Sequence, residues 1–434
     1  MKLKRKIKDD LIAWKNKIKG RMPLLVYGAR QVGKTYIIQD FGDSFYKNTA
    51  YVNLETNQTV SSYFSENIEP EHLIRFLETE VNRRIVPGET LIVFDEIQTC
   101  ERALTSLKYF NEKAPEYPIV CAGSLLGVAI NREKYSFPVG NVDSMTMFPM
   151  DFEEFLWALD EEKLAKEIRG SYESNEALPS AMHEKAMDLY KIYLICGGMP
   201  MPVLSYAESG SLIGVPDVQN KIINDYIADM VKYSSNAESV KIRSAYNSIP
   251  VQLAKENKKF QYKLAQRGGT AAIFGSAIDW LGFAGVVLKC TRVEHGTEPV
   301  SVYGDLANFK LYMGDTGLLT MKSGISMQTV LAVGETDNTF LGALAENYVA
   351  QALFARRYDL YYWTSEGKAE IDFVLQKGRE IIPVEVKAGT RTKSKSLAVF
   401  NEKYKPAYSI RISGKNFGFE NNIKSIPLYA VFCI

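Results

Sequence analysis

The sequence predicts an α/β protein of several domains, the first built around a parallel sheet that carries a phosphate-binding loop. An apolar segment runs into a glycine-bounded loop and then a helical segment, "PLLVYGARQVGKTYIIQDF". A second apolar segment, "ETLIVFDEIQTC", ends in two carboxylates, as a buried parallel strand does at a ligand site. The length of 434 residues exceeds one ordinary core, so roughly two to four domains are expected.

The composition is that of a soluble globular chain, with 46% hydrophobic and 24% charged residues. A net charge of +1 creates no overall field toward nucleic acid or a membrane, so any such preference must be local. No stretch reaches the ~18 apolar residues of a membrane span, so we expect a cytoplasmic protein without a membrane partner. The cysteines lack ligand spacing, so we expect buried free thiols and no zinc site: Cys100, Cys121, Cys196, Cys290 and Cys433.

The basic N-terminal segment, residues 1–22, is expected to form an amphipathic helix, because Ile7, Leu11, Trp14 and Ile18 recur at helical spacing. The favoured interpretation is that this apolar face docks on the next domain, since Trp14 and its neighbours need burial. The alternative is a basic arm that contacts phosphates.

The loop "GARQVGKT", Gly28 to Thr35, fits the pattern G-x-x-x-x-G-K-[ST] between a strand and a helix. Its glycines let backbone N–H groups and the helix N-terminus face phosphates. Lys34 would add charge at the β- and γ-phosphates, and the Thr35 hydroxyl would ligate Mg²⁺. A glycine-rich turn without a ligand is the less favoured alternative. We expect ATP and Mg²⁺ as cofactors, and a nucleotide contacted by Gly28, Ala29, Arg30, Gln31, Val32, Gly33, Lys34, Thr35 and Tyr36.

Polar residues end the strands expected beside the loop. Asp95 would hold Mg²⁺ through water and Glu96 would polarise the attacking water, although the pair could instead cap the next helix. Ser124, at the end of "YPIVCAGS", could bond the γ-phosphate or the attacking water, and ordinary turn chemistry explains it nearly as well. The order of loop, Asp-Glu strand and Ser strand is typical of P-loop ATPases with an additional strand. No GxGxxG follows a strand, so a dinucleotide fold is not expected.

Four segments, "GARQVGKT", "TLIVFDEIQ", "CAGSLLGVAI" and "FPVGNVDSMTMFPMDFEEFL", resemble prokaryotic AAA-like ATPases. In that family a C-terminal domain of uncharacterised function often resembles PD-(D/E)xK nucleases. The resemblance implies that Gly28, Gly33, Lys34 and Thr35 bind nucleotide, that Asp95 and Glu96 serve Mg²⁺ and hydrolysis, and that Ser124 is the sensor. It also implies an ATPase core at 23–150, a helical lid at 151–233, a winged-helix-like domain at 234–322 and a nuclease-like domain at 338–434.

The middle of the chain offers two ambiguous features. "CGGMP" resembles the Gly-x-Pro element that some AAA-like ATPases place against the nucleotide, here Gly198 and Pro200, or it simply terminates a helix. The winged-helix-like segment could contact DNA, or it could serve only for packing.

The C-terminal stretch "EIDFVLQKGREIIPVEVKAG" reads as a hairpin that follows a helix and a strand. Glu385 and Lys387 are two residues apart, so they share one face of their strand. With Asp372 and with Glu346 on the helix, they match the nuclease pattern: Glu346, Asp372 and Glu385 as metal ligands, and Lys387 near the attacking water. The alternative is a nuclease-like domain that binds without cutting.

From Arg391 onward the chain has eight basic residues against two acids, an excess that suits a phosphate backbone or a solvated face: Arg391, Lys393, Lys395, Lys403, Lys405, Arg411, Lys415 and Lys424. Two functions stay open. One is an ATPase coupled to DNA or RNA, and the other is an ATP-dependent switch that acts on a protein partner through a non-catalytic C-terminal domain. An oligomer is possible on either hypothesis, and Arg102 and Arg132 are the candidate arginine fingers.

Overall fold

The computed structural model describes residues 2–17, 19–124, 138, 140–334, 338–367, 369–390 and 395–434. The chain divides into two compact units. The N-terminal unit consists of Arg5–Phe148 with Phe283–Gly285, and the C-terminal unit of Met1–Lys4, Pro149–Gly282 and Val286–Ile434. The finer division into five parts stays a prediction.

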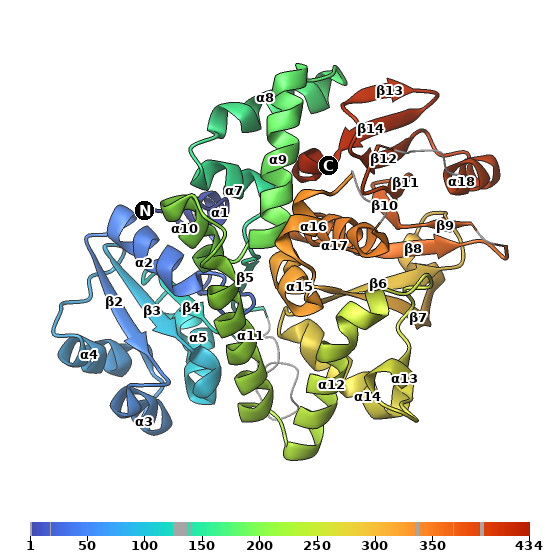
Figure 1. Cartoon of the computed structure of the whole chain (residues 1–434). Coiled ribbons are helices and arrows are strands. Elements are labelled where there is room, and N and C mark those ends of the chain that lie inside the picture. The colour runs from blue at the N-terminus through green and yellow to red at the C-terminus, as the bar shows by residue number, and fades with distance from the viewer. Residues whose placement is uncertain are drawn as a thin grey trace. The chain divides into compact units, whose positions relative to one another are not determined.

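A parallel sheet forms the centre of the N-terminal unit (Figure 1). Its strands lie in the order β2-β3-β4-β1-β5, and every pairing is parallel. β4 thus lies between the loop strand β1 and the carboxylate strand β3, which confirms the predicted additional strand. Since the strands are parallel, the carboxyl ends of β1, β3 and β4 meet at one edge of the sheet. The strands are β1 (Leu24–Tyr27), β2 (Asn48–Asn53), β3 (Thr90–Asp95), β4 (Ile119–Ala122) and β5 (Asp143–Thr146).

Helices bury the apolar faces of this sheet. α2 packs on β2, β3 and β4, while α5 contacts α3 and α4. Leu25, Ile92, Phe94 and Phe110 belong to the resulting core, and each large side chain buried in this way contributes about 1.5–3 kcal/mol. The helices are α2 (Lys34–Phe45), α3 (Gln58–Glu66), α4 (Pro70–Glu80) and α5 (Glu101–Lys113).

The N-terminal helix α1 (Ile7–Lys15) docks on α2, which confirms the favoured interpretation of the basic segment. It buries Ile7, Leu11 and Trp14, and the Trp14 indole donates to the carbonyl of Met22 at 2.9 Å. Ile18, the fourth position of the predicted apolar face, lies outside the described residues.

The C-terminal unit opens with the predicted run of helices. α7 begins with a capping box, in which Asp151 and Glu154 each accept a hydrogen bond from the other's backbone N–H. The helices are α7 (Phe152–Ala158), α8 (Glu162–Ser174), α9 (Ser180–Cys196), α10 (Pro200–Ser209) and α11 (Val215–Lys232). Across the described residues, no helix is long and apolar enough to span a membrane.

Three helices and two antiparallel strands follow in the order expected for the winged-helix-like segment. However, β6 also pairs in parallel with β8, so the sheet runs β7-β6-β8-β9 and joins this segment to the end of the chain. This pairing was not predicted from the sequence. The elements are α12 (Asn236–Leu253), α13 (Tyr262–Ala265), α14 (Ala271–Phe283), β6 (Val287–Val293), β7 (Gly304–Met313), α15 (Thr316–Ser323) and α16 (Met327–Leu331).

The predicted C-terminal hairpin is confirmed. β10 and β11 are antiparallel with Lys377 opposite Glu380, and Gly378 in the turn has a φ of 61°. The sheet continues as β10-β11-β12-β14-β13, with β11, β12 and β14 parallel. All five cysteines of the chain are buried and free, as predicted. The elements are α17 (Thr339–Ala355), β8 (Tyr361–Thr364), β9 (Glu370–Ile371), β10 (Phe373–Lys377), β11 (Glu380–Val386), α18 (Ser396–Tyr404), β12 (Ser409–Ser413), β13 (Gly418–Glu420) and β14 (Ile423–Pro427).

Candidate functional site

The glycine-bounded loop connects β1 to α2 at the carboxyl edge of the N-terminal sheet. Gly28 has a φ of 139°, and a Cβ there would lie 2.2 Å from the carbonyl oxygen of Met147. Gly33, with a φ of 95°, is the residue that precedes the first turn of α2. Both positions therefore require glycine, and the loop delivers the N-terminus of a helix to the site, where free N–H groups favour an anion.

Lys34 is buried in the loop itself. Its ammonium donates to the carbonyl oxygens of Gly28 and Ala29, both at 2.8 Å. These contacts hold a positive charge among the backbone groups that the sequence predicts to surround phosphates. Of the other predicted nucleotide contacts, Val32 is buried, whereas Tyr36 is 45% exposed on α2.

Thr35 and Asp95 are brought together although they belong to different elements. The Thr35 hydroxyl donates to Oδ2 of Asp95 at 2.8 Å, and the hydroxyl of Tyr51 donates to the same oxygen at 2.8 Å. Mg²⁺ prefers oxygen ligands such as hydroxyls and carboxylates, so Thr35 and Asp95 together fit the predicted Mg²⁺ site. Tyr51, on β2, was missed because a tyrosine in an alternating strand carries no local signal of a site.

Glu96 and Ser124 also meet. Oε2 of Glu96 accepts from the Ser124 hydroxyl at 3.2 Å and from Nε2 of Gln98 at 2.5 Å. Glu96 has a φ of 51°, a left-handed conformation that costs a non-glycine residue roughly 1–2 kcal/mol. Its backbone N–H donates to Oδ1 of Asp95 at 3.0 Å. Glu96 occupies the N-cap position of the short 3-10 helix η1 (Ile97–Thr99), but its side chain makes no capping hydrogen bond there.

A buried arginine donates hydrogen bonds to a backbone carbonyl of the loop and to one further along the chain. Arg5 donates to the carbonyl oxygen of Val32 at 2.8 Å and to that of Phe148 at 2.6 Å. Its presence in a basic N-terminal run concealed this role at the sequence level. Of the two candidate arginine fingers, Arg102 donates to the carbonyl oxygen of Phe64 at 3.4 Å, and Arg132 lies outside the described residues.

Gly198 and Pro200 belong to the C-terminal unit, in the turn between α9 and α10. The N–H of Gly198 donates to Oδ2 of buried Asp315 at 2.6 Å, and Pro200 is the first residue of α10. The structure thus gives both residues a role within their own unit.

The C-terminal residues predicted as a metal site lie in two groups. Glu346 on α17 is buried and accepts from Lys310 at 2.9 Å, and also from Lys258 and from the Tyr312 hydroxyl. These two lysines hold the pKa of Glu346 well below its usual range, against the opposing effect of burial.

Asp372 lies between β9 and β10, where Oδ2 accepts the backbone N–H of Val386 at 2.8 Å. Burial, with the charge of Glu346 second, raises the pKa of Asp372 to about 6. Glu385 on β11 lies 3.5 Å from the Lys387 ammonium and 3.3 Å from Nε of Arg411. Within the part of the chain that the structure describes, no three His, Cys, Asp or Glu side chains are placed to hold a metal ion.

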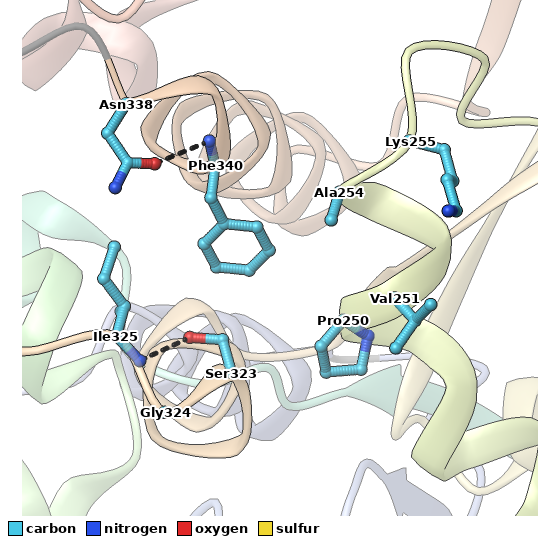
Figure 2. Close-up of a pocket in the computed structure, with 9 residues that line it drawn as sticks. All are labelled: Pro250, Val251, Ala254, Lys255, Ser323, Gly324, Ile325, Asn338 and Phe340. Atoms are coloured by element: carbon cyan, nitrogen blue, oxygen red, sulfur yellow. Dashed lines mark hydrogen bonds between the residues drawn. The ribbon is translucent and has the colours of Figure 1, made fainter.

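A separate hollow of about 460 Å³ lies between the ends of α12 and α15 and the start of α17 (Figure 2). Val251, Ile325 and Phe340 give it apolar walls, and Lys255 lies at its side. It contains none of the predicted site residues.

Comparison with known proteins finds a family model that covers the loop. A family model described as an AAA domain matches residues 20–156, which include the loop, Asp95, Glu96 and Ser124. Residues 20–156 are therefore similar to AAA domains. Two models described as domains of unknown function, DUF8612 and DUF4143, match residues 187–329 and 341–431. Neither description names an activity, so the nuclease likeness stays a prediction.

Several solved structures resemble the chain weakly. The Walker-type ATPase PABY2304 of Pyrococcus abyssi shares 16% identity over 74% of this chain and 96% of its own, with a TM-score of 0.44. The ORC2 protein of Aeropyrum pernix, in ADPNP-ADP complexes, shares 10% over 81% and 96%, with a TM-score of 0.35. No curated protein sequence matches the chain. Likenesses this weak say nothing about what the chain binds.

Proposed function

We propose that the protein binds ATP at the loop of its AAA domain and hydrolyses it with Mg²⁺. The observation that carries the proposal is the 2.8 Å contact between Thr35 and Asp95, with Glu96 held beside them by Ser124. Lys34 would exchange the loop carbonyls for phosphate oxygens and neutralise their charge. Thr35 and Asp95 would hold Mg²⁺, which screens phosphate charge when it is bound.

Glu96 is the residue that would act on water. Its carboxylate would accept a proton from the attacking water, while Ser124 and Gln98 fix the direction in which it points. The test is steady-state ATP hydrolysis by the full chain with Lys34→Ala as the blank. Hydrolysis that survives in Lys34→Ala would refute the site.

The partner of the ATPase is the finer part of the proposal. Coupling to DNA or RNA is supported by the order of α12–α14 and β6–β7, which suits a winged helix, and by the order of α17 and β8–β11, which suits a nuclease-like core. Stimulation of ATP hydrolysis by DNA, lost in Lys34→Ala, is the result this coupling requires.

A specific observation favours the second candidate, a nucleotide-dependent switch that acts on a protein partner. Arg411 contacts Glu385, Lys424 donates to the carbonyl oxygen of Tyr172 at 2.8 Å, and Lys403 lies over the rings of Trp363 and Tyr404. Three of the basic residues predicted to face a phosphate backbone thus have partners within the protein. Slow ATP turnover that is indifferent to DNA would support the switch.

A further inference from the structure

The strongest feature outside the AAA domain is a buried charged cluster in the C-terminal unit. Lys310, on β7, is 1% exposed, and its ammonium donates to Glu346 at 2.9 Å and to Glu370 at 2.6 Å. Lys258 donates to the other oxygen of Glu346. We call Lys258, Lys310, Glu346, Glu370 and Asp372 the charge centre.

The predicted nuclease likeness implies a divalent cation at Glu346 and Asp372, but the hydrogen bonds that Glu346 already accepts argue against one. Both oxygens of Glu346 already accept hydrogen bonds from a lysine, and one also accepts from the Tyr312 hydroxyl. Lys310 is buried, so moving its ammonium away would break two charge-assisted hydrogen bonds inside the protein. A metal ion at Glu346 would have to displace the two lysine ammonium groups and the Tyr312 hydroxyl from the carboxylate.

The net charge of the charge centre also argues against a bound divalent cation. Two ammonium groups and three carboxylates give the charge centre a net charge of −1, so a divalent cation would change its net charge to +1. At short range in a buried site, like charges repel by about 4 kcal/mol or more per pair at an effective dielectric of 20. Glu385 does not supply the missing negative charge, because its carboxylate already lies beside the basic groups of Lys387 and Arg411.

We infer that Lys258 and Lys310 take the place of a divalent cation in the charge centre, so that the C-terminal core binds no metal there and does not cleave phosphodiesters. The lysines join β7 and the loop after α12 to α17, a structural task that metal ligation would otherwise perform. The inference does not depend on ATP hydrolysis, since every residue in it belongs to the C-terminal unit.

The first test is Mn²⁺ binding by calorimetry on the full chain without nucleotide. Asp95→Asn removes the candidate ion site of the AAA domain, and we expect no Mn²⁺ binding in that variant. Binding that persists in Asp95→Asn and falls more than 10-fold when Asp372→Asn is added would overturn the inference.

A second measurement tests the lysine itself. Lys310→Met leaves Glu370 without this lysine and Glu346 with Lys258 as its only lysine partner in the charge centre, so we expect its Tm to fall by several degrees, or folding to fail. The matched control is Lys289→Met, because Lys289 is exposed on the neighbouring strand β6. A Lys310→Met protein as stable as the control would contradict the inference, whatever the Mn²⁺ titration shows.

Discussion

The hydroxyls of Thr35 and Tyr51 both donate to Oδ2 of Asp95, each at 2.8 Å. One comes from the first turn of α2 and the other from β2, so the carboxylate at the end of β3 is fixed from both sides. Removal of groups that orient a metal-binding carboxylate in this way typically lowers metal affinity by about 10–100-fold. This arrangement supports the proposal that Thr35 and Asp95 hold Mg²⁺.

Tyr51→Phe removes one of these donors and keeps the ring. We expect the Mg²⁺ concentration for half-maximal ATP hydrolysis to rise about 10-fold, because the carboxylate loses part of its orientation. The free energy of unfolding should fall by about 1 kcal/mol for the lost hydrogen bond. Tyr63→Phe, on α3 in the same unit, is the control. An unchanged Mg²⁺ requirement would leave Tyr51 with a role in stability only.

Lys34→Ala should lower ATP hydrolysis by on the order of 100-fold or more, because the charge that would meet the β- and γ-phosphates is lost. The carbonyls of Gly28 and Ala29 lose their partner as well, so a modest fall in Tm is expected. Lys47→Ala controls for the loss of one positive charge, since Lys47 makes an exposed ion pair with Glu89. Equal rates of ATP hydrolysis in Lys34→Ala and Lys47→Ala would show that Lys34 has no role in hydrolysis.

Glu96→Gln should separate hydrolysis from binding. An amide cannot accept the proton of the attacking water, so kcat should fall by about 10²–10⁴-fold while ATP still binds. Binding is measured with a fluorescent ATP analogue, and Glu101→Gln, at the exposed start of α5, is the control. A fall in ATP affinity that matches the fall in kcat would show that Glu96 acts on binding and not on water.

Gly28→Ala tests the packing of the loop against Met147, the residue directly after β5. The added Cβ would lie 2.2 Å from the carbonyl oxygen of Met147, so β5 and the loop must separate. Gly88 has a φ of +70° with no atom within 4 Å of its added Cβ, so Gly88→Ala measures the backbone cost alone. We expect Gly28→Ala to lower the free energy of unfolding by about 1–3 kcal/mol more than Gly88→Ala. Equal melting temperatures would contradict this.

The features predicted correctly from the sequence are local. The loop and its flanking strand and helix lie within one segment of chain, and the hairpin register that sets Lys377 opposite Glu380 follows from a two-residue turn. The edge where Glu96 and Ser124 meet was also predictable, because parallel strands place their carboxyl ends together.

The features that were missed depend on long-range packing. Lys310 is 36 residues from Glu346 in the sequence, and Lys258 is 88 residues away, so no spacing rule connects them. The parallel pairing of β6 with β8 likewise joins segments that are far apart in the sequence. The carboxylates of the C-terminal pattern were predictable as residues, but the cations beside them come from segments assigned to a different domain.

Asp315 provides a test of the C-terminal unit by pH. It is buried, and this burial raises the pKa of the Asp315 carboxyl to about 6, against the opposing effect of the N–H donors of Gly198 and Leu318. The folded state therefore binds a proton more tightly than the unfolded state, whose Asp titrates near the ordinary value of about 4. The stabilisation is complete below pH 4 and is lost as the pH rises through 6, by roughly 3 kcal/mol in total.

Asp315→Asn cannot titrate, so the free energy of unfolding of the wild type relative to this variant should decrease between pH 4 and pH 6 and stay constant above. Urea unfolding at four pH values across that window measures the difference directly. Asp217→Asn, at the exposed start of α11, controls for the loss of a carboxylate. A difference that grows with pH would mean that the hydrogen bonds from Gly198 and Leu318 outweigh burial, and that Asp315 is charged in the folded protein at every pH tested.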